Sequence, residues 1–142
     1  MSYAICIVPV APVRTLHDHR AEMSSQLLFG EQVKIVSQTE NGWAQVECCK
    51  DGYTGCCRMN QFLLLDKMIE TTNEYVAAWV QPIHVNDQML MIPLGSDLSI
   101  LKATIPGYTI LYEGEIIEAG SRRFSESNIR QFSQPFLNTA YV

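Results

Sequence analysis

The chain has 142 residues, of which 47% are hydrophobic and 18% are charged, and its formal net charge is −5 at pH 7. This length suits one ordinary domain or two very small ones, and the composition predicts a packed core rather than disorder. An acidic chain lacks the basic surface on which non-specific nucleic-acid binding depends. No run of about 18 apolar residues is present to span a membrane. We therefore expect neither nucleic acid nor membrane among its partners.

The N-terminal sequence and the cysteine count both favour a cytoplasmic protein. The first residues contain no basic region, and Pro9 and Pro12 interrupt the apolar run, so the segment is a poor signal peptide. Five cysteines are an odd number, which fits a reducing compartment better than a framework of disulfides.

Two segments precede the most regular part of the chain. Residues 3–14 predict a first strand or extended segment, and Pro9 and Pro12 predict that it lies at a sheet edge, because proline cannot donate to a strand ladder. Residues 15–26 are polar and irregular, which predicts a long loop with one helical turn at most.

Residues 27–55 predict consecutive β-hairpins. Two strand runs are separated by Asn41-Gly42, and the second leads into Asp51-Gly52, dipeptides that favour tight turns. Apolar and polar residues alternate along 33–35 and 44–48, as expected for half-buried antiparallel strands. We expect Trp43 to anchor a small barrel core. A short 3₁₀ turn at residues 60–62 is expected to precede a last strand at 63–65.

A second unit is predicted because residues 94–100 repeat the pattern of residues 29–35, in which an apolar residue and a glycine precede a strand. Strand-like residues 108–112, a turn at Glu113-Gly114 and strand-like residues 115–118 follow. We therefore predict a mainly β chain of two small SH3-like β-barrels in tandem plus a short C-terminal helix. The predicted domains are residues 1–66 and 67–124.

Residues 125–142 differ in character from the rest. Ser125 suits a helix N-cap, Ile129 and Phe132 follow at helical spacing, and Pro135 would stop the helix. The chain then ends in an apolar stretch, Phe136-Leu137-Asn138-Thr139-Ala140-Tyr141-Val142. We expect residues 125–142 to be a helix and linker leading to a further domain.

The turn motifs at Leu27-Leu28-Phe29-Gly30-Glu31, Asn41-Gly42-Trp43 and Asp51-Gly52-Tyr53-Thr54-Gly55 resemble those of a bacterial SH3-like domain. With a second unit, a helix and the C-terminal stretch, nearly the whole chain resembles the N-terminal region of an NlpC-type cell-wall cysteine peptidase. In that family such a tail runs into a Trp-Gly-Gly stretch and an Asp-Cys-Ser-Gly nucleophile motif. The resemblance implies that the catalytic cysteine and its two histidine partners are absent here.

The resemblance also implies a substrate and a binding site. Enzymes of the family cleave the γ-D-glutamyl bond to a diamino acid in murein stem peptides, often during cell-wall recycling. In several tandem members an acidic residue and a tyrosine of the first domain hold the free amine of the peptide, and Glu22 and Tyr53 match these positions. The alternative for the pair is a solvated glutamate and a tyrosine at the rim of the core. The alternative for the chain is a stand-alone SH3-like module that binds cell-wall peptides or a protein partner.

The remaining candidate residues favour structural interpretations. A nucleophilic cysteine needs a base within hydrogen-bond reach, and Cys48-Cys49 and Cys56-Cys57 are explained equally well as packed strand positions. Adjacent residues of a strand face opposite sides, so these pairs offer two thiols rather than four to a zinc ion. His17 and His19 lack further ligands at matching spacing, and Arg122-Arg123 suit a solvated linker. We expect no catalytic residue, metal or other cofactor in this chain.

Overall fold

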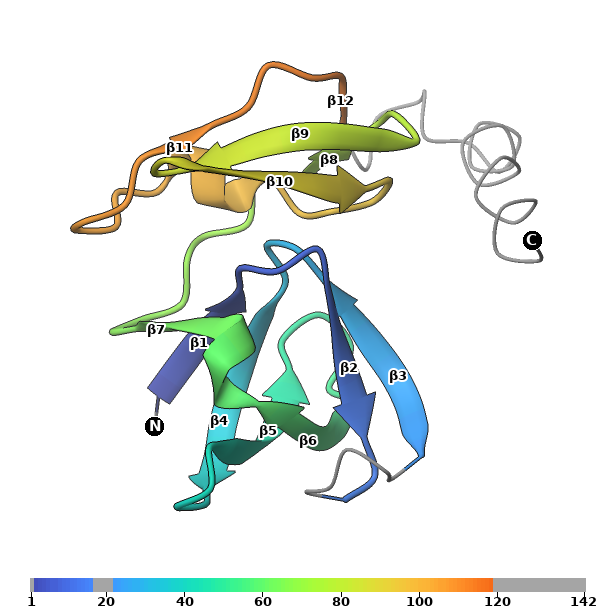
Figure 1. The fold of residues 1–142 in the computed structure, drawn as a ribbon, viewed down its shortest axis with the longest axis vertical. Helices are drawn as coiled ribbons and strands as arrows, with labels where there is room; N and C mark the ends of the chain where they lie inside the picture. Colours follow the sequence, from blue (N-terminus) through green and yellow to red (C-terminus); the bar gives the residue numbers. More distant parts are fainter. Residues whose placement is uncertain (1, 17–21, 119–142) are drawn as a thin grey trace. The chain divides into compact units, whose positions relative to one another are not determined.

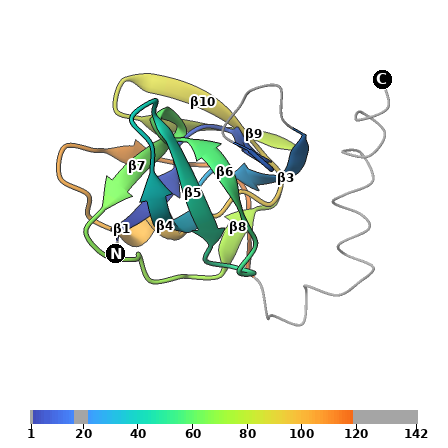
Figure 2. The same cartoon turned by 90° about the horizontal axis from the view of Figure 1, so that it is seen from below.

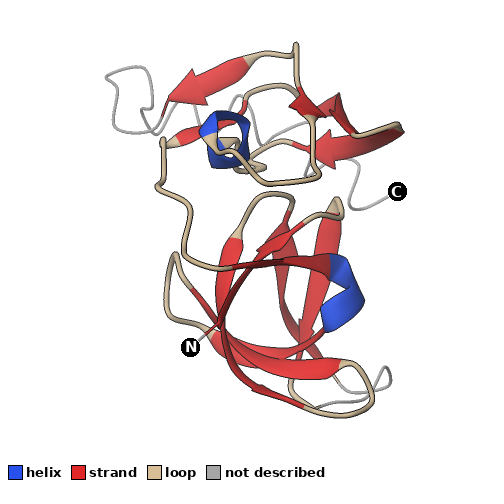
Figure 3. Ribbon diagram, turned by 90° about the vertical axis from the view of Figure 1, so that its left-hand side faces the viewer, coloured by secondary structure: helices blue, strands red, loops and turns tan. Residues whose placement is uncertain are grey.

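A computed structural model describes residues 2–16 and 22–118. The fold is mainly β, as predicted, and Figure 3 shows helical colour only at two short 3₁₀ turns of the described chain. The chain divides into two compact units, the first ending at Ile69 and the second beginning at Glu70. The predicted helix at 125–134 and the linker after it lie outside the described residues.

The first unit is a seven-stranded antiparallel sheet with the order β3-β2-β6-β5-β4-β1-β7 (Figure 1). Its strands are β1 (Ser2–Cys6), β2 (Val10–Arg14), β3 (Met23–Leu28), β4 (Gln32–Gln38), β5 (Trp43–Cys48), β6 (Thr54–Arg58) and β7 (Phe62–Leu65). A 3₁₀ turn at Met59–Gln61 leads into β7, within one residue of the predicted turn and last strand.

This sheet has to curl upon itself. Strands β1 and β2 are four places apart in the sheet order, which corresponds to about 19 Å in a flat sheet. Only three residues separate Cys6 from Val10, and that connection spans at most about 14 Å. Backbone hydrogen bonds from Phe29 to the carbonyl of Pro9 and from Gly30 to the carbonyl of Cys6 hold the connection against the turn between β3 and β4. The sheet of the first unit is therefore strongly curled, as in SH3-like domains.

The hairpin predictions are confirmed. Strands β4 and β5 pair across the Asn41-Gly42 turn, and β5 and β6 pair across Asp51-Gly52, with φ of 82° at Gly42 and 75° at Gly52. Figure 2 shows these three strands side by side. The predicted inward residues of both strands are buried, namely Val33, Ile35, Ala44, Val46 and Cys48. Trp43 is also buried, and the Arg58 guanidinium carbon lies 5.4 Å from its ring centroid.

Two predictions for the beginning of the chain are wrong. Residues 3–14 form two strands rather than one, and β1 lies between β4 and β7 rather than at an edge. Pro9 lies outside both strands. Pro12 faces a partner only on one side, Gln26 of β3, because β2 pairs with β6 at Arg14 alone. Residues 23–26, predicted as loop, begin edge strand β3. Their side chains are mostly exposed, so the apolar alternation that marks a strand is missing from the sequence.

Between Glu70 and Glu118, the described part of the second unit, five short strands form two sheets. They are β8 (Glu74–Val76), β9 (Val80–Val85), β10 (Gln88–Pro93), β11 (Ile110–Leu111) and β12 (Ile116–Glu118). Strands β10, β9 and β11 form one sheet, and β12 pairs with β8. Its buried apolar side chains include Val76 of β8, Ile83 of β9 and Ile92 of β10. They also include Leu98 and Ile100, at the start of the 3₁₀ turn at Ser99–Lys102 and within it.

The same backbone turn occurs in both units. Gly30 (φ 85°) donates to the carbonyl of Cys6 at 2.8 Å, and Gly95 (φ 89°) donates to the carbonyl of Val76 at 3.0 Å. Three further backbone hydrogen bonds of the first unit have a counterpart in the second. In the first unit they run from Phe29 N to Pro9 O, from Glu31 N to Leu28 O and from Cys6 N to Glu31 O. Their counterparts, in the same order, run from Leu94 N to Trp79 O, from Ser96 N to Pro93 O and from Val76 N to Ser96 O. The repeated sequence pattern at 29–30 and 94–95 therefore marks equivalent turns.

After this turn the units diverge, and two predictions for the second unit are corrected. Where the repeated pattern predicted a strand after Gly95, the chain forms the 3₁₀ turn, because the Asp97 carboxylate accepts the N–H of Ser99 at 2.8 Å and bends the backbone. The segments on either side of Glu113-Gly114 are strands, but they do not pair with each other. Strand β11 pairs with β9, and β12 pairs with β8.

Candidate functional site

Glu22 and Tyr53 lie at the same end of the first unit, before two strands that flank β2. Glu22 directly precedes β3, and Tyr53 directly precedes β6. Both strands run antiparallel to β2 and flank it, so both begin at the end of the sheet where β2 finishes at Arg14. The backbone N–H of Thr15 donates to the carbonyl of Glu22 at 3.0 Å, which extends the β2–β3 pairing up to this point. We call this end, defined by Arg14, Glu22 and Tyr53, the β2 end.

The backbone that carries Tyr53 is fixed by the Asp51-Gly52 turn. The N–H of Tyr53 donates to the Asp51 carboxylate at 3.0 Å, and its carbonyl accepts the N–H of Cys48 at 2.8 Å. The N–H of Gly52 donates to the carbonyl of Cys48 at 2.8 Å, which closes the turn. The Tyr53 side chain is 39% exposed and Glu22 is also exposed. The Tyr53 phenol, on a hydrogen-bonded turn, and the Glu22 carboxylate, on the other side of β2, are therefore both accessible from solvent at this end.

A close approach of the backbone adds to the definition of this end. An added Cβ at Gly55 would lie 2.3 Å from Cγ1 of Val13 and 3.1 Å from the carbonyl oxygen of Arg14. Only glycine lets β6 approach β2 this closely, so Gly55 sets the spacing of the strands that carry the β2 end. This role was not predicted from the sequence, although a glycine inside a strand is a known sign of close backbone approach. Arg14 was missed as well, because only the strand register places it here.

The five cysteines are poor nucleophiles. All are free thiols within the described residues, and four are buried, with Cys49 partly exposed. Burial raises the pKa of Cys6 and of Cys57 to about 12 and that of Cys48 to about 11, from an ordinary value of 9.0. Burial also raises the pKa of Cys49 and of Cys56. A catalytic thiol needs a lowered pKa, so these thiols have the properties of core packing groups.

The histidines are placed only in part by the structure. His17 and His19 lie outside the described residues, as do Arg122 and Arg123. His84 is exposed on β9. Among residues 2–16 and 22–118, no group of three or more histidine, cysteine, aspartate or glutamate side chains is arranged to hold a metal ion. In the same part of the chain, no helix has the length and apolar character needed to cross a bilayer.

Comparison with known families identifies the first unit. Residues 13–55 match the family described as "Bacterial dipeptidyl-peptidase Sh3 domain". The first unit is therefore mainly β and similar to an SH3-like domain associated with bacterial peptidases. The matched range runs from β2 to the start of β6, and it includes Glu22, Tyr53 and Gly55 of the β2 end. No curated protein matches the chain.

Proposed function

We propose that this chain is the substrate-positioning SH3-like part of a murein peptide-cleaving cysteine peptidase of the NlpC type, a γ-D-glutamyl-L-diamino acid endopeptidase. The observation that carries the proposal is the match of residues 13–55 to a bacterial dipeptidyl-peptidase Sh3 domain, which covers the β2 end. The peptidase chemistry belongs to a catalytic domain outside this sequence. The raised pKa values of all five thiols support that assignment, because none of them is poised to act as the nucleophile.

The second unit is, in this proposal, a second SH3-like domain that has lost its central hairpin. The four matching backbone hydrogen bonds around Gly30 and Gly95 support it. The strand pairing supports it too, since β8 pairs with β12 as β1 pairs with β7, and β9 pairs with β11 as β2 pairs with β6. The 3₁₀ turn at Ser99–Lys102 stands where the first unit has β4 and β5.

The β2 end would recognise the free N-terminal amine of a trimmed stem peptide. The Glu22 carboxylate would pair with the ammonium group, and the Tyr53 phenol would hydrogen-bond beside it. A charge-assisted hydrogen bond contributes about 1.5–3 kcal/mol, which corresponds to about 10- to 100-fold in affinity. A murein peptide whose amine is blocked would lose this contribution. Selection for trimmed peptides suits a recycling enzyme, and we place that role in the cytoplasm.

The test is a titration of the chain with L-Ala-γ-D-Glu-meso-diaminopimelate and with its N-acetylated form, followed by ¹⁵N NMR and calorimetry. We expect the free-amine peptide to shift the amides around Glu22 and Tyr53 and to bind at least tenfold more tightly than the acetylated one. Glu22→Gln should abolish this preference and Tyr53→Phe should weaken it. Glu40→Gln, an exposed glutamate in the β4–β5 turn, serves as the control.

The other outcomes separate the alternatives. Equal binding of both peptides, or shifts away from the β2 end, would contradict the proposed site. Weak binding, with a Kd of about 1 mM, that keeps the preference for the free amine would fit one part of a composite site, whereas micromolar binding by this chain alone would favour a stand-alone receptor for cell-wall peptides. Hydrolysis of the peptide by this chain alone would overturn the assignment of catalysis to another domain.

A further inference from the structure

The connection between the two units is held from the first unit by a buried glutamine. The Gln32 side chain is 8% exposed, and its Nε2 donates to the carbonyl of Ile69 at 2.9 Å. Its Oε1 accepts the N–H of the same residue at 2.7 Å. One side-chain amide thereby satisfies both backbone groups of Ile69, as a neighbouring strand would.

Gln32 is itself immobilised by the sheet. It begins β4, pairs with Ile5 of β1, and its carbonyl accepts the N–H of Cys49 at 3.0 Å. Ile5 is fully buried. The amide that holds Ile69 is therefore anchored in the sheet of the first unit, and the chain is fixed at Ile69 although this residue lies beyond the last strand.

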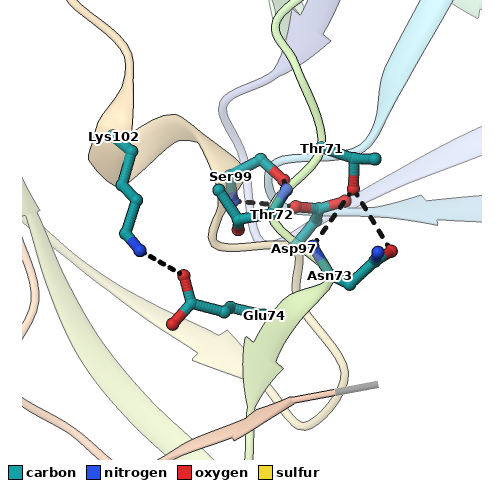
Figure 4. A network of polar contacts seen from close by, with 7 residues as sticks. All are labelled: Thr71, Thr72, Asn73, Glu74, Asp97, Ser99 and Lys102. Atoms are coloured by element: carbon teal, nitrogen blue, oxygen red, sulfur yellow. Dashed lines mark hydrogen bonds and ion pairs between the residues drawn. The ribbon is translucent and has the colours of Figure 1, made fainter. Parts of the chain in front are cut away.

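A second hold begins three residues later, on the side of the second unit (Figure 4). The N–H of Thr72 donates to Oγ of Ser99 at 3.0 Å, and Ser99 is 1% exposed. The N–H of Ser99 donates in turn to the Asp97 carboxylate at 2.8 Å. Figure 4 also shows the ion pair of Glu74 with Lys102, at 3.2 Å, which ties β8 to the same 3₁₀ turn.

The two holds use equivalent positions of the two units. Gln32 and Asp97 each follow the shared glycine turn by two residues. Gln32 pairs with Ile5 of β1, and Asp97 pairs with Tyr75 of β8. Gln32 fixes the chain at Ile69, where it leaves the first unit. Asp97 orients Ser99, which fixes the chain at Thr72, where it enters the second unit.

We propose that these contacts are a pair of clamps that confine bending between the units to Glu70 and Thr71. Eight residues separate β7 from β8, and a free linker of that length has an end-to-end distance of about 15 Å. With the carbonyl of Ile69 and the N–H of Thr72 both held, only the φ and ψ angles of two residues can vary between them. The connection acts as a two-residue hinge, whatever ligand the β2 end binds.

The experiment measures backbone order along the connection by ¹⁵N relaxation in the full chain without ligand. In the wild type we expect order parameters of about 0.85 at Ile69 and at residues 72–74, with lower values at Glu70 and Thr71 between them. Gln32→Leu keeps the side-chain volume and removes both hydrogen bonds. It should lower the order parameter of Ile69 below about 0.6 and remove the protection of its amide from hydrogen exchange. Gln32→Glu keeps the acceptor and should give an intermediate loss.

Ser99→Ala tests the second clamp independently and should lower the order of Thr72 while leaving Ile69 unchanged. Gln45→Leu, at an exposed glutamine of β5, is the matched control and should change neither residue. Uniformly low order from 66 to 73 in the wild type would overturn the proposal. So would Gln32→Leu and Ser99→Ala variants in which Ile69 and Thr72 stay as ordered as in the wild type. Because no peptide is present, failure of the function proposed above would not affect this result.

Discussion

Substitution of Gly55 by alanine should destabilise the first unit through a single steric overlap. The added Cβ would lie 2.3 Å from Cγ1 of Val13, a fully buried residue. Valine has little freedom about χ1, so the methyl group cannot turn aside easily. On its other side Gly55 pairs with Val46 of β5, which is also fully buried. Strand β2 or β6 must therefore shift to accommodate the methyl group.

Overpacking of this kind costs about 1–3 kcal/mol, and we expect the upper part of that range because the carbonyl of Arg14 also lies within 3.1 Å of the added atom. For a domain of this size, about 2.5 kcal/mol corresponds to a fall of about 10–20 °C in Tm. Urea and thermal unfolding would be followed by Trp43 fluorescence in a Trp79→Phe background, so that the signal reports the first unit.

A double-mutant cycle tests the cause. Val13→Ala removes the overlapping methyl group, so Gly55→Ala should cost about 1–2 kcal/mol less in that background. Gly52→Ala is the matched control: its φ is 75°, but its nearest neighbour is the Glu47 carboxylate at 3.8 Å. That substitution should cost about 1–2 kcal/mol from backbone strain alone and show no coupling to Val13. Additive effects of Gly55→Ala and Val13→Ala would refute the steric explanation.

Two further predictions concern the thiols and the Trp43 contact. Burial raises the pKa of Cys6 and of Cys57 to about 12, so these thiols ionise in the unfolded chain first, as the pH passes 9.0. The free energy of unfolding should therefore keep its full value below that pH. Above it, the free energy of unfolding should fall by about 1.4 kcal/mol per pH unit for each thiol. Urea midpoints between about pH 8 and 10.5 measure this slope, Cys6→Ala should reduce it, and an unchanged slope would contradict the assignment. Arg58→Gln should cost about 1 kcal/mol by removing the cation–π contact with Trp43, whereas Arg58→Lys should retain part of it. Trp43 fluorescence under urea reports the loss, and equal midpoints for Arg58→Gln and the wild type would argue against it.

The parts of the fold that the sequence predicted are those determined by neighbours along the chain. The β4–β5 hairpin follows from alternating apolar residues and from an Asn-Gly turn that begins three residues after β4 ends and directly precedes β5. The 3₁₀ turn before β7 and the glycine turns at Gly30 and Gly95 are equally local. Each of these features needs only a few adjacent residues to form, so the necessary information lies within a short window.

The wrong predictions concern elements whose structure depends on distant partners. Strand β3 begins with Met-Ser-Ser-Gln, which has no strand pattern, and the ladder to β2 is what makes it a strand. The segment at 98–100 has strand-like residues, but the Asp97 carboxylate and the carbonyl of Glu74 capture its N–H groups and bend it into a 3₁₀ turn. Local propensity is a weak guide in such places, because tertiary contacts outweigh it.

The β2 end shows why a site is harder to predict than a hairpin. Glu22 and Tyr53 are 31 positions apart, and no spacing rule relates a residue before one strand to a residue before another. They come to one end only because β3 and β6 both run antiparallel to β2, and because Gly55 lets β6 approach it.

The substitution of Gly55 therefore has a consequence beyond stability. If the β2 end binds a peptide through both side chains, Gly55→Ala should weaken that binding even where the unit remains folded, since the strand that carries Tyr53 is displaced. Binding that survives a confirmed shift of β6 would show that Tyr53 does not contribute to the site.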